Sequence, residues 1–102
     1  MTQRGDVKLR TILLKPGRSV TLTDLPLRTL VVVQSVQDAA PHDPIARRLR
    51  ELGFVEGEPV EVVAKGPTGG EPLLVRVGYT RFALRRAEAA RVLVAPAAGA
   101  AA

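Results

Sequence analysis

The stretch Asp43 to Val62, D-P-I-A-R-R-L-R-E-L-G-F-V-E-G-E-P-V-E-V, predicts a helix, a glycine-rich turn and a strand in direct succession. Asp43 can accept hydrogen bonds from the first free amides of a helix, and Pro44 suits the first helical position because an N–H there would have no partner. We expect Gly53 to end the helix in the left-handed conformation, with Phe54 folding back onto the last turn. The start and the end of this helix are therefore both specified.

The predicted helix is amphipathic. Ile45, Leu49 and Leu52 recur at i, i+4 and i+7, the spacing of one buried helical stripe. The opposite side carries charged side chains, namely Arg47, Arg48, Arg50 and Glu51. The helix should bury its apolar stripe and present a mainly cationic face to solvent or to a partner.

Composition predicts one small domain without disulfides or reactive thiols. The chain has 102 residues, of which 46% are hydrophobic and only 3% aromatic, so the core must consist of aliphatic side chains. The absence of cysteine excludes a disulfide framework, a thiolate zinc cluster and a cysteine nucleophile. No run approaches the roughly 20 apolar residues of a membrane span, and the N-terminus lacks a signal-peptide pattern. We expect a cytoplasmic protein that does not itself span the membrane.

The net charge of +5 is concentrated at the N-terminus. Residues 1–20 account for four of the five net positive charges, so the rest of the chain is close to neutral. We expect residues 1–19 to form a basic leader that is flexible or adds a strand, and the Ala-rich residues 95–102 to be disordered. This distribution argues against nucleic acid as the partner of the folded part, although the pI near 10.7 would invite it.

The remaining pattern predicts a mainly β fold. The β-branched composition and the turn residues between runs predict strands over residues 30–36, 59–65, 73–77, 81–85 and 92–94, with a helical turn over residues 86–90. In the second strand we expect Val60, Val62 and Ala64 to face inward, and the alternate residues to face outward, namely Glu61, Val63 and Lys65. About five short strands, with one helix between the first and the second, indicate a closed or nearly closed small barrel.

Several segments together resemble the FeoA family over residues 20–94. They are L-T-D-L-P-L at residues 22–27, R-R-L-R-E-L-G-F-V-E-G-E-P-V-E-V at residues 47–62, P-L to V-G-Y at residues 72–79, and A-L-R-R-A-E-A-A-R-V-L-V at residues 83–94. The resemblance implies an SH3-like β-barrel. Gly53, Phe54 and Gly57 are the most recognisable family residues, and we interpret them as structural, because backbone geometry alone accounts for both glycines.

The resemblance also implies a function and a partner. FeoA proteins are small cytoplasmic proteins of bacterial ferrous iron transport, and the implied partner is the membrane transporter FeoB, whose cytoplasmic part hydrolyses GTP. The resemblance leaves open whether such a protein activates hydrolysis, gates transport or aids assembly. It implies recruitment to the inner face of the membrane by the partner. An exposed strand edge would also allow a weak homodimer beside the monomer.

Three other classes of binding protein compete with this interpretation. SH3-like domains also occur in metal-dependent repressors, but 19 preceding residues are too few for a DNA-reading helix-turn-helix. A small barrel that binds RNA or DNA would need a basic groove with stacking rings, and the only rings are Phe54, Tyr79 and Phe82. A stand-alone, metal-responsive interaction domain is the third alternative.

An enzyme is not expected. The chain has one histidine, and neither Ser19 nor Ser35 has an activating partner in the pattern. The glycine-rich segment 66–70 lacks the form of a phosphate-binding loop. We therefore predict no catalytic residue and no cofactor site.

Metal binding is likewise not expected, with one weak alternative. His42 lies between Asp38 and Asp43, and such a set of oxygen and nitrogen donors could hold a divalent transition metal weakly. Against this, Asp43 is already assigned to the helix cap.

The predicted partner interface combines a turn with the cationic helix face. Its residues are Pro26, Leu27, Arg28, Arg47, Arg48, Arg50 and Glu51. The arginines could meet an acidic surface of the GTP-binding domain or supply an arginine to hydrolysis. For Leu27 we expect a position in the core or at its rim, with an exposed interface anchor as the alternative.

Overall fold

The computed structural model describes residues 20–97. Its elements, in chain order, are the 3₁₀ turn η1 (Leu22–Asp24), β1 (Val31–Val36), α2 (Pro44–Leu52), β2 (Pro59–Gly66), β3 (Gly70–Val77), β4 (Thr80–Leu84), α3 (Arg86–Ala89) and β5 (Val92–Pro96). Each predicted strand and helix is present, with ends that differ from the prediction by at most three residues.

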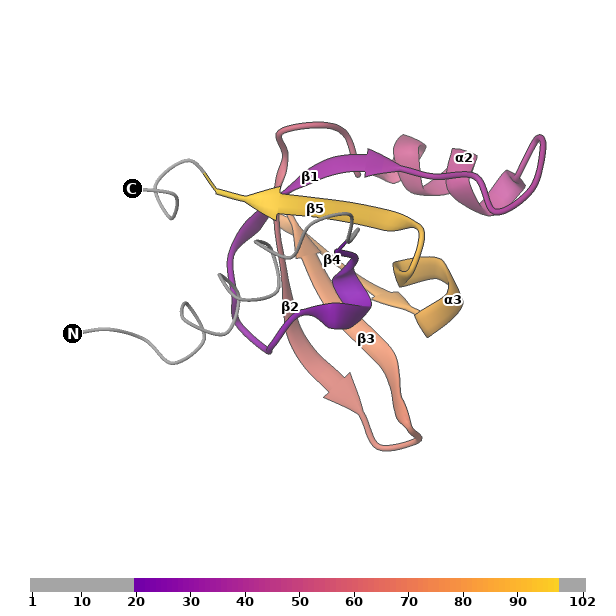
Figure 1. The fold of residues 1–102 in the computed structure, drawn as a ribbon. Helices are drawn as coiled ribbons and strands as arrows, with labels where there is room; N and C mark the ends of the chain where they lie inside the picture. The colour runs from indigo at the N-terminus through magenta and orange to yellow at the C-terminus, as the bar shows by residue number, and fades with distance from the viewer. Residues whose placement is uncertain (1–19, 98–102) are drawn as a thin grey trace.

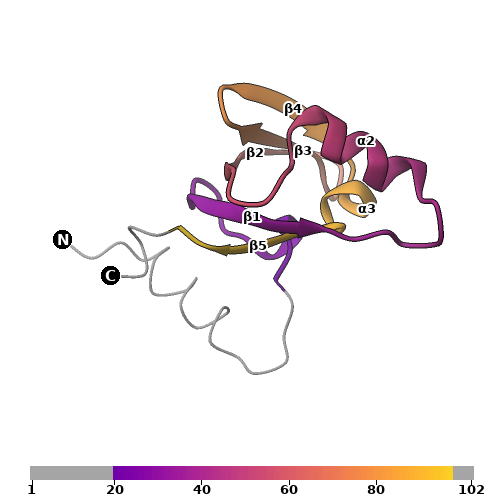
Figure 2. The same ribbon diagram turned by 90° about the horizontal axis from the view of Figure 1, so that it is seen from above.

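The five strands form one antiparallel sheet in the order β4-β3-β2-β1-β5. β1 and β2 share only the pairs Val31 with Val60 and Val32 with Pro59, so the sheet bends sharply at this junction. Figures 1 and 2 show β1 and β5 as one layer and β2, β3 and β4 as the other, with α2 and α3 at one end. The core of buried aliphatic side chains lies between these layers. The mainly β class is confirmed, while the sheet remains open because no pairing joins β4 to β5.

Helix α2 has the predicted ends. The side chain of Asp43 accepts from the Ile45 N–H at 3.0 Å, and Gly53 adopts the left-handed φ of 116°. The Phe54 N–H then donates to the Leu49 carbonyl, and the Phe54 ring is almost completely buried. The predicted stripe is wrong at one residue, because Ile45 is 36% exposed and the neighbouring Ala46 is fully buried instead.

Strand β2 departs from the predicted alternation. Its pairing with β3 shifts between Val62 and Ala64, which marks a bulge. Beyond the bulge the facing reverses, so Val63 is buried and Ala64 is exposed, contrary to the prediction for both residues. Glu61 is also buried, because its carboxylate pairs with Arg76 on the adjacent strand.

The two ends of the chain are only partly covered by the described residues. Val20 and Thr21 lie beside β5, where the Val94 N–H donates to the Val20 carbonyl. β5 extends to Pro96, so the prediction of disorder is wrong for Ala95 and Pro96. The predictions for residues 1–19 and 98–102 lie outside the described residues. No helix formed by residues 20–97 is long and apolar enough to span a membrane.

Candidate docking surface

The turn between β3 and β4 holds an exposed aromatic ring. Val77 pairs with Thr80, which leaves Gly78 and Tyr79 as a two-residue turn. Gly78 has φ of 57° and Tyr79 does not, the arrangement of a type II′ turn with glycine at its first central position. The Tyr79 side chain at this turn is completely exposed, which is unusual for so large a ring.

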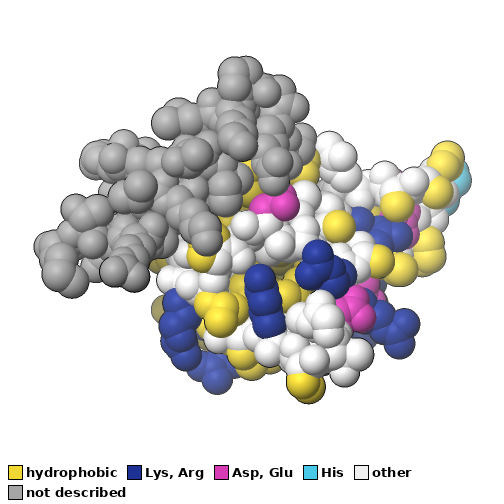
Figure 3. Space-filling view, turned by 60° about the horizontal axis from the view of Figure 1, so that its bottom comes forward, with side chains coloured by type: hydrophobic (Ala, Val, Ile, Leu, Met, Phe, Trp, Pro, Cys, Tyr) yellow, Lys and Arg dark blue, Asp and Glu magenta, His cyan; other side chains and the backbone are white. Residues whose placement is uncertain are grey.

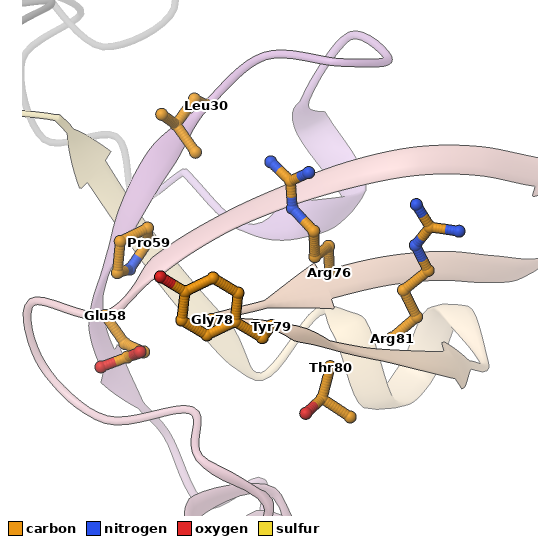
Figure 4. A pocket seen from close by; sticks show the side chains of 8 residues that line it. All are labelled: Leu30, Glu58, Pro59, Arg76, Gly78, Tyr79, Thr80 and Arg81. Atoms are coloured by element: carbon orange, nitrogen blue, oxygen red, sulfur yellow. The ribbon is translucent and has the colours of Figure 1, made fainter.

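An open groove lies beside this ring. It is lined by Leu30, Glu58, Pro59, Arg76, Gly78, Tyr79, Thr80 and Arg81. Figure 4 shows the guanidinium groups of Arg76 and Arg81 directed to the same side, with Leu30 above them and the Tyr79 ring between them and Glu58. Leu30 is 47% exposed although it directly precedes β1. We call this set of residues the Tyr79 groove.

Charge within the Tyr79 groove is uneven. Arg76 is held by an ion pair with the nearly buried carboxylate of Glu61. Arg81 makes no ion pair with any residue in the range 20–97. Its guanidinium is therefore available to a carboxylate or a backbone carbonyl of a partner, in a setting where arginine makes strong bidentate contacts.

The first part of the predicted interface lies near this groove. Leu27 is 49% exposed, so the expected position in the core or at its rim is wrong and the alternative of an exposed residue holds. Arg28 adopts a left-handed φ of 61°, and its N–H donates to the Val62 carbonyl at 2.8 Å. This bond fixes the turn to β2 while the Leu27 side chain remains in solvent. Leu27 and Leu30 thus give the region two exposed apolar side chains.

The second part of the predicted interface lies on α2, and the structure does not bring the two parts together. Figures 1 and 2 place α2 and the turn after η1 at opposite ends of the molecule. The three arginines of the helix also differ in their contacts. Arg47 pairs with Glu51 in solvent, Arg50 binds the Val36 carbonyl and Asp38 at 2.7 Å each, and Arg48 has no ion pair among residues 20–97. Arg50 is therefore a structural residue.

The family model of the FeoA domain matches residues 20–96, the whole of the ordered sheet and both helices. The chain belongs to the FeoA family. The FeoA family serves bacterial ferrous iron transport, as the resemblance implied. Comparison with curated protein sequences gives no match.

Solved FeoA structures share this fold. FeoA of Stenotrophomonas maltophilia, described as an SH3 domain protein complexed with zinc, is 68% identical, with a TM-score of 0.70 over 74% of this chain and 89% of that one. FeoA of Chlorobium tepidum is 32% identical and has a TM-score of 0.66. The match covers 78% of this chain and 72% of the C. tepidum chain. A FeoA-like protein of Clostridium acetobutylicum is 24% identical and has a TM-score of 0.65, with 78% of this chain and 87% of the C. acetobutylicum chain covered. At this identity the match shows the fold alone. The predicted SH3-like fold is confirmed.

The weak metal alternative is not assembled in this FeoA chain. Both Asp43 oxygens are engaged, Oδ1 by the Ile45 N–H and Oδ2 by the Ala39 N–H and Arg91 Nε. Asp38 binds Arg50, and His42 lies in the exposed loop before α2, visible in cyan at the edge of Figure 3. Within residues 20–97, no group of three or more histidine or acidic side chains could hold a metal ion.

The rings do not form a stacking platform for nucleic acid. Phe54 is buried and packs against Phe82, with ring centroids 6.1 Å apart, so only Tyr79 is free among the aromatic residues. Figure 3 shows lysine and arginine side chains interspersed with hydrophobic ones over one face of the FeoA chain. A mixed cationic and apolar surface of this kind suits an acidic protein surface better than a phosphate backbone.

Sequence reasoning missed the central residues of the Tyr79 groove. Leu30, Arg76 and Tyr79 come from different strands and turns, and only the folded sheet brings them together. One signal was present in the sequence, because Gly78-Tyr79 places the only tyrosine of the chain at a turn. Tyrosine and arginine are the residue types most enriched among energetically dominant interface residues.

The contacts of the α2 arginines give a first prediction. Arg50→Ala should lower the free energy of unfolding by about 1 kcal/mol, because the Val36 carbonyl and Asp38 lose their donor. Arg47→Ala removes only an exposed ion pair and should change it by less than about 0.5 kcal/mol. Urea denaturation of both variants measures the difference. Equal stability of the two variants would contradict the structural role of Arg50.

Proposed function

We propose that this FeoA protein is a non-enzymatic accessory module of bacterial ferrous iron uptake, which docks on the cytoplasmic GTP-binding domain of a FeoB-type transporter and modulates it. Family membership supports the transport system. The protein then acts in the cytoplasm and reaches the inner face of the membrane through its partner. The relative from S. maltophilia is described as a candidate ferrous iron transport activating factor, which agrees with a regulatory rather than a catalytic role.

The exposed ring of Tyr79 is the observation that carries docking. A completely exposed tyrosine lies beside the half-exposed Leu30 and beside Arg81, which has no ion pair within the described range 20–97. This combination has the composition of an interface centre. Burial of the ring and of Leu30 against a partner would remove apolar area from water and contribute a few kcal/mol to binding, at roughly 25 cal/mol per Å². Arg81 would add a charge-assisted hydrogen bond in the same contact.

Modulation requires that docking distinguish between states of the partner. A module that binds the GTP-bound and GDP-bound forms equally tightly shifts no equilibrium, however strong the complex. A tenfold preference for one state shifts that equilibrium by about 1.4 kcal/mol. The affinity for each nucleotide state therefore decides whether the module is a regulator or only a scaffold.

Tyr79→Ala is expected to weaken the complex with the purified GTP-binding domain about tenfold or more, because the ring is the largest exposed apolar group of the groove. The affinity is measured by calorimetry with the domain free of nucleotide, bound to GDP and bound to a GTP analogue, with hydrolysis followed in parallel. Val55→Ala is the matched control, since Val55 is 48% exposed but does not line the groove.

The outcomes of this experiment separate the parts of the proposal. If the unaltered protein binds in none of the three states, the docking model is wrong. Binding that Tyr79→Ala leaves unchanged would keep the function and remove the groove from the interface. Equal affinity in all states would support docking and contradict modulation.

A further inference from the structure

Among the residues that the structure describes, strand β4 leaves one edge unpaired. It is the last strand of the sheet and pairs only with β3, from Val77 with Thr80 to Leu73 with Leu84. Within residues 20–97, no other backbone hydrogen bond involves residues 80–84. The opposite edge of the sheet differs, because Val20 and Thr21 lie beside β5.

The register identifies the backbone groups at this edge. A two-residue turn closes on a hydrogen-bonded pair, here Val77 with Thr80, and hydrogen-bonded pairs then alternate with non-bonded pairs along an antiparallel ladder. Residues 80, 82 and 84 accordingly bond to β3. The N–H and C=O groups of Arg81 and Ala83 point away from β3, toward the open edge.

A groove with apolar and charged lining residues runs beside the same edge, between β4 and α2. Its lining is Ile45, Arg48, Leu49, Leu52, Phe82, Ala83, Leu84 and Glu88. The half-exposed Ile45, which the helical pattern placed in the core, lies here. Glu88 also lines this groove and keeps its negative charge, with its carboxylate accepting a hydrogen bond from the Arg85 N–H at 2.8 Å. Arg48 is the cation of this groove and has no ion pair among the described residues.

Side chains along the edge alternate in character. Arg81, Ala83 and Arg85 face one side of the strand, while Phe82 and Leu84 face the other, toward the core and the groove. Arg81 and Arg85 are exposed and have no ion pair within residues 20–97. A strand added here would therefore meet cations on one face and apolar side chains on the other.

We propose that the β4 edge is a strand-addition site for an extended segment of a partner protein that alternates acidic and apolar side chains. The free groups of Arg81 and Ala83 supply the backbone hydrogen bonds, as in known cases of β-augmentation. Acidic side chains of the segment pair across the strands with the arginines, and its apolar side chains enter the groove beside α2. This contact shares Arg81 with the Tyr79 groove but does not involve the Tyr79 ring.

Charge argues against a second copy of this chain as the occupant. If two β4 strands paired antiparallel about Ala83, Arg81 of each copy would lie opposite Arg85 of the other. Like charges placed directly opposite each other destabilise an antiparallel pair. Arginines at the edge thus disfavour self-pairing in this register, as charged residues at strand edges commonly do, and they favour an acidic segment.

The test uses the full chain and two synthetic peptides, one alternating valine with glutamate and one alternating valine with lysine. NMR titration should show the glutamate peptide binding about tenfold or more tightly than the lysine peptide, with slowed amide exchange at Arg81 and Ala83. Ala83→Pro should weaken that binding about tenfold, since proline removes an outward N–H and costs no bond to β3. Ala83→Ser keeps the N–H and serves as the matched control.

Every outcome of this titration decides the proposal. Arg81→Glu should reverse the preference between the peptides, which gives a second variant in case Ala83→Pro does not fold. The Tyr79→Ala variant should bind the glutamate peptide as tightly as the unaltered chain does. The strand-addition proposal can therefore hold even if the protein does not dock on the GTP-binding domain. Absence of binding at millimolar peptide, equal affinity for both peptides, or shifts confined to residues outside β4 and α2 would overturn the proposal.

Discussion

Replacement of Phe54 by alanine is expected to lower the free energy of unfolding by about 4 kcal/mol, the usual cost of removing a fully buried ring. Phe54 is only 1% exposed and is the largest of the fully buried side chains. It also contacts the partly buried ring of Phe82, which lies in β4. Because a small domain has a total stability of roughly 5–10 kcal/mol, the variant should retain only a marginal folded state.

Urea denaturation followed by circular dichroism measures this loss. Phe54→Leu should cost about 1.5 kcal/mol, since leucine refills most of the space, and Tyr79→Ala should cost almost nothing because that ring contacts only solvent. A loss below about 2 kcal/mol for Phe54→Ala would mean that the ring does not anchor the core. The contrast between the two aromatic residues separates a structural ring from an interface ring.

Local signals made the helix predictable from the sequence. The cap at Asp43, the proline after it and the left-handed Gly53 act within a few residues of one another, so their effect does not depend on the rest of the chain. The burial of Phe54 followed from the same end motif. The strands were also predictable as segments, because β-branched residues and turn residues alternate along the chain.

Inward and outward positions were less predictable, because the sheet is irregular. The bulge in β2 reverses the facing of Val63 and Ala64, and nothing in the local sequence places it. On α2, the small Ala46 allows close packing of the helix, which turns Ile45 toward the groove. In each case the tertiary structure, which the pattern does not contain, selects the buried side.

The candidate docking surface depended on contacts distant in sequence. Arg76 and Arg81 are equally basic in the sequence, yet only Arg76 is neutralised, by Glu61 on the neighbouring strand. The sequence pattern places Arg50 in the interface, whereas in the folded chain Arg50 donates a hydrogen bond to the Val36 carbonyl. Which charges are free is a property of the folded chain, and this explains why the predicted interface contained one structural arginine and lacked Tyr79.

Asp43→Asn is expected to lower the melting temperature by roughly 5–10 °C at neutral pH, because Asp43 joins three segments of the fold. Its side chain, 5% exposed, accepts from the Ala39 N–H at 2.8 Å, from the Ile45 N–H at 3.0 Å and from Arg91 Nε at 2.6 Å. Asparagine caps a helix as well as aspartate does, so the variant keeps the bond to Ile45 and loses the charge that Arg91 requires. Asp43→Ala should lose both the cap and the charge, and should melt at a lower temperature still.

The charge of Asp43 also predicts how this difference depends on pH. The hydrogen bond from Arg91, followed by that from the Ala39 amide, lowers the pKa of Asp43 from 3.8 to about 2. Because folding lowers its pKa, Asp43 binds a proton more readily in the unfolded chain than in the folded one. The ionised carboxylate therefore stabilises the fold fully above about pH 5, and this stabilisation disappears between about pH 4 and pH 2. The melting temperatures of the unaltered chain and Asp43→Asn should therefore differ by a constant amount from pH 7 to pH 5 and converge as the pH falls toward 2. Asparagine does not titrate, and the other carboxylates are the same in both proteins, so their acid effects cancel in the comparison. A difference in melting temperature that stays constant down to pH 2 would show that the ionised Asp43 carboxylate does not stabilise the fold.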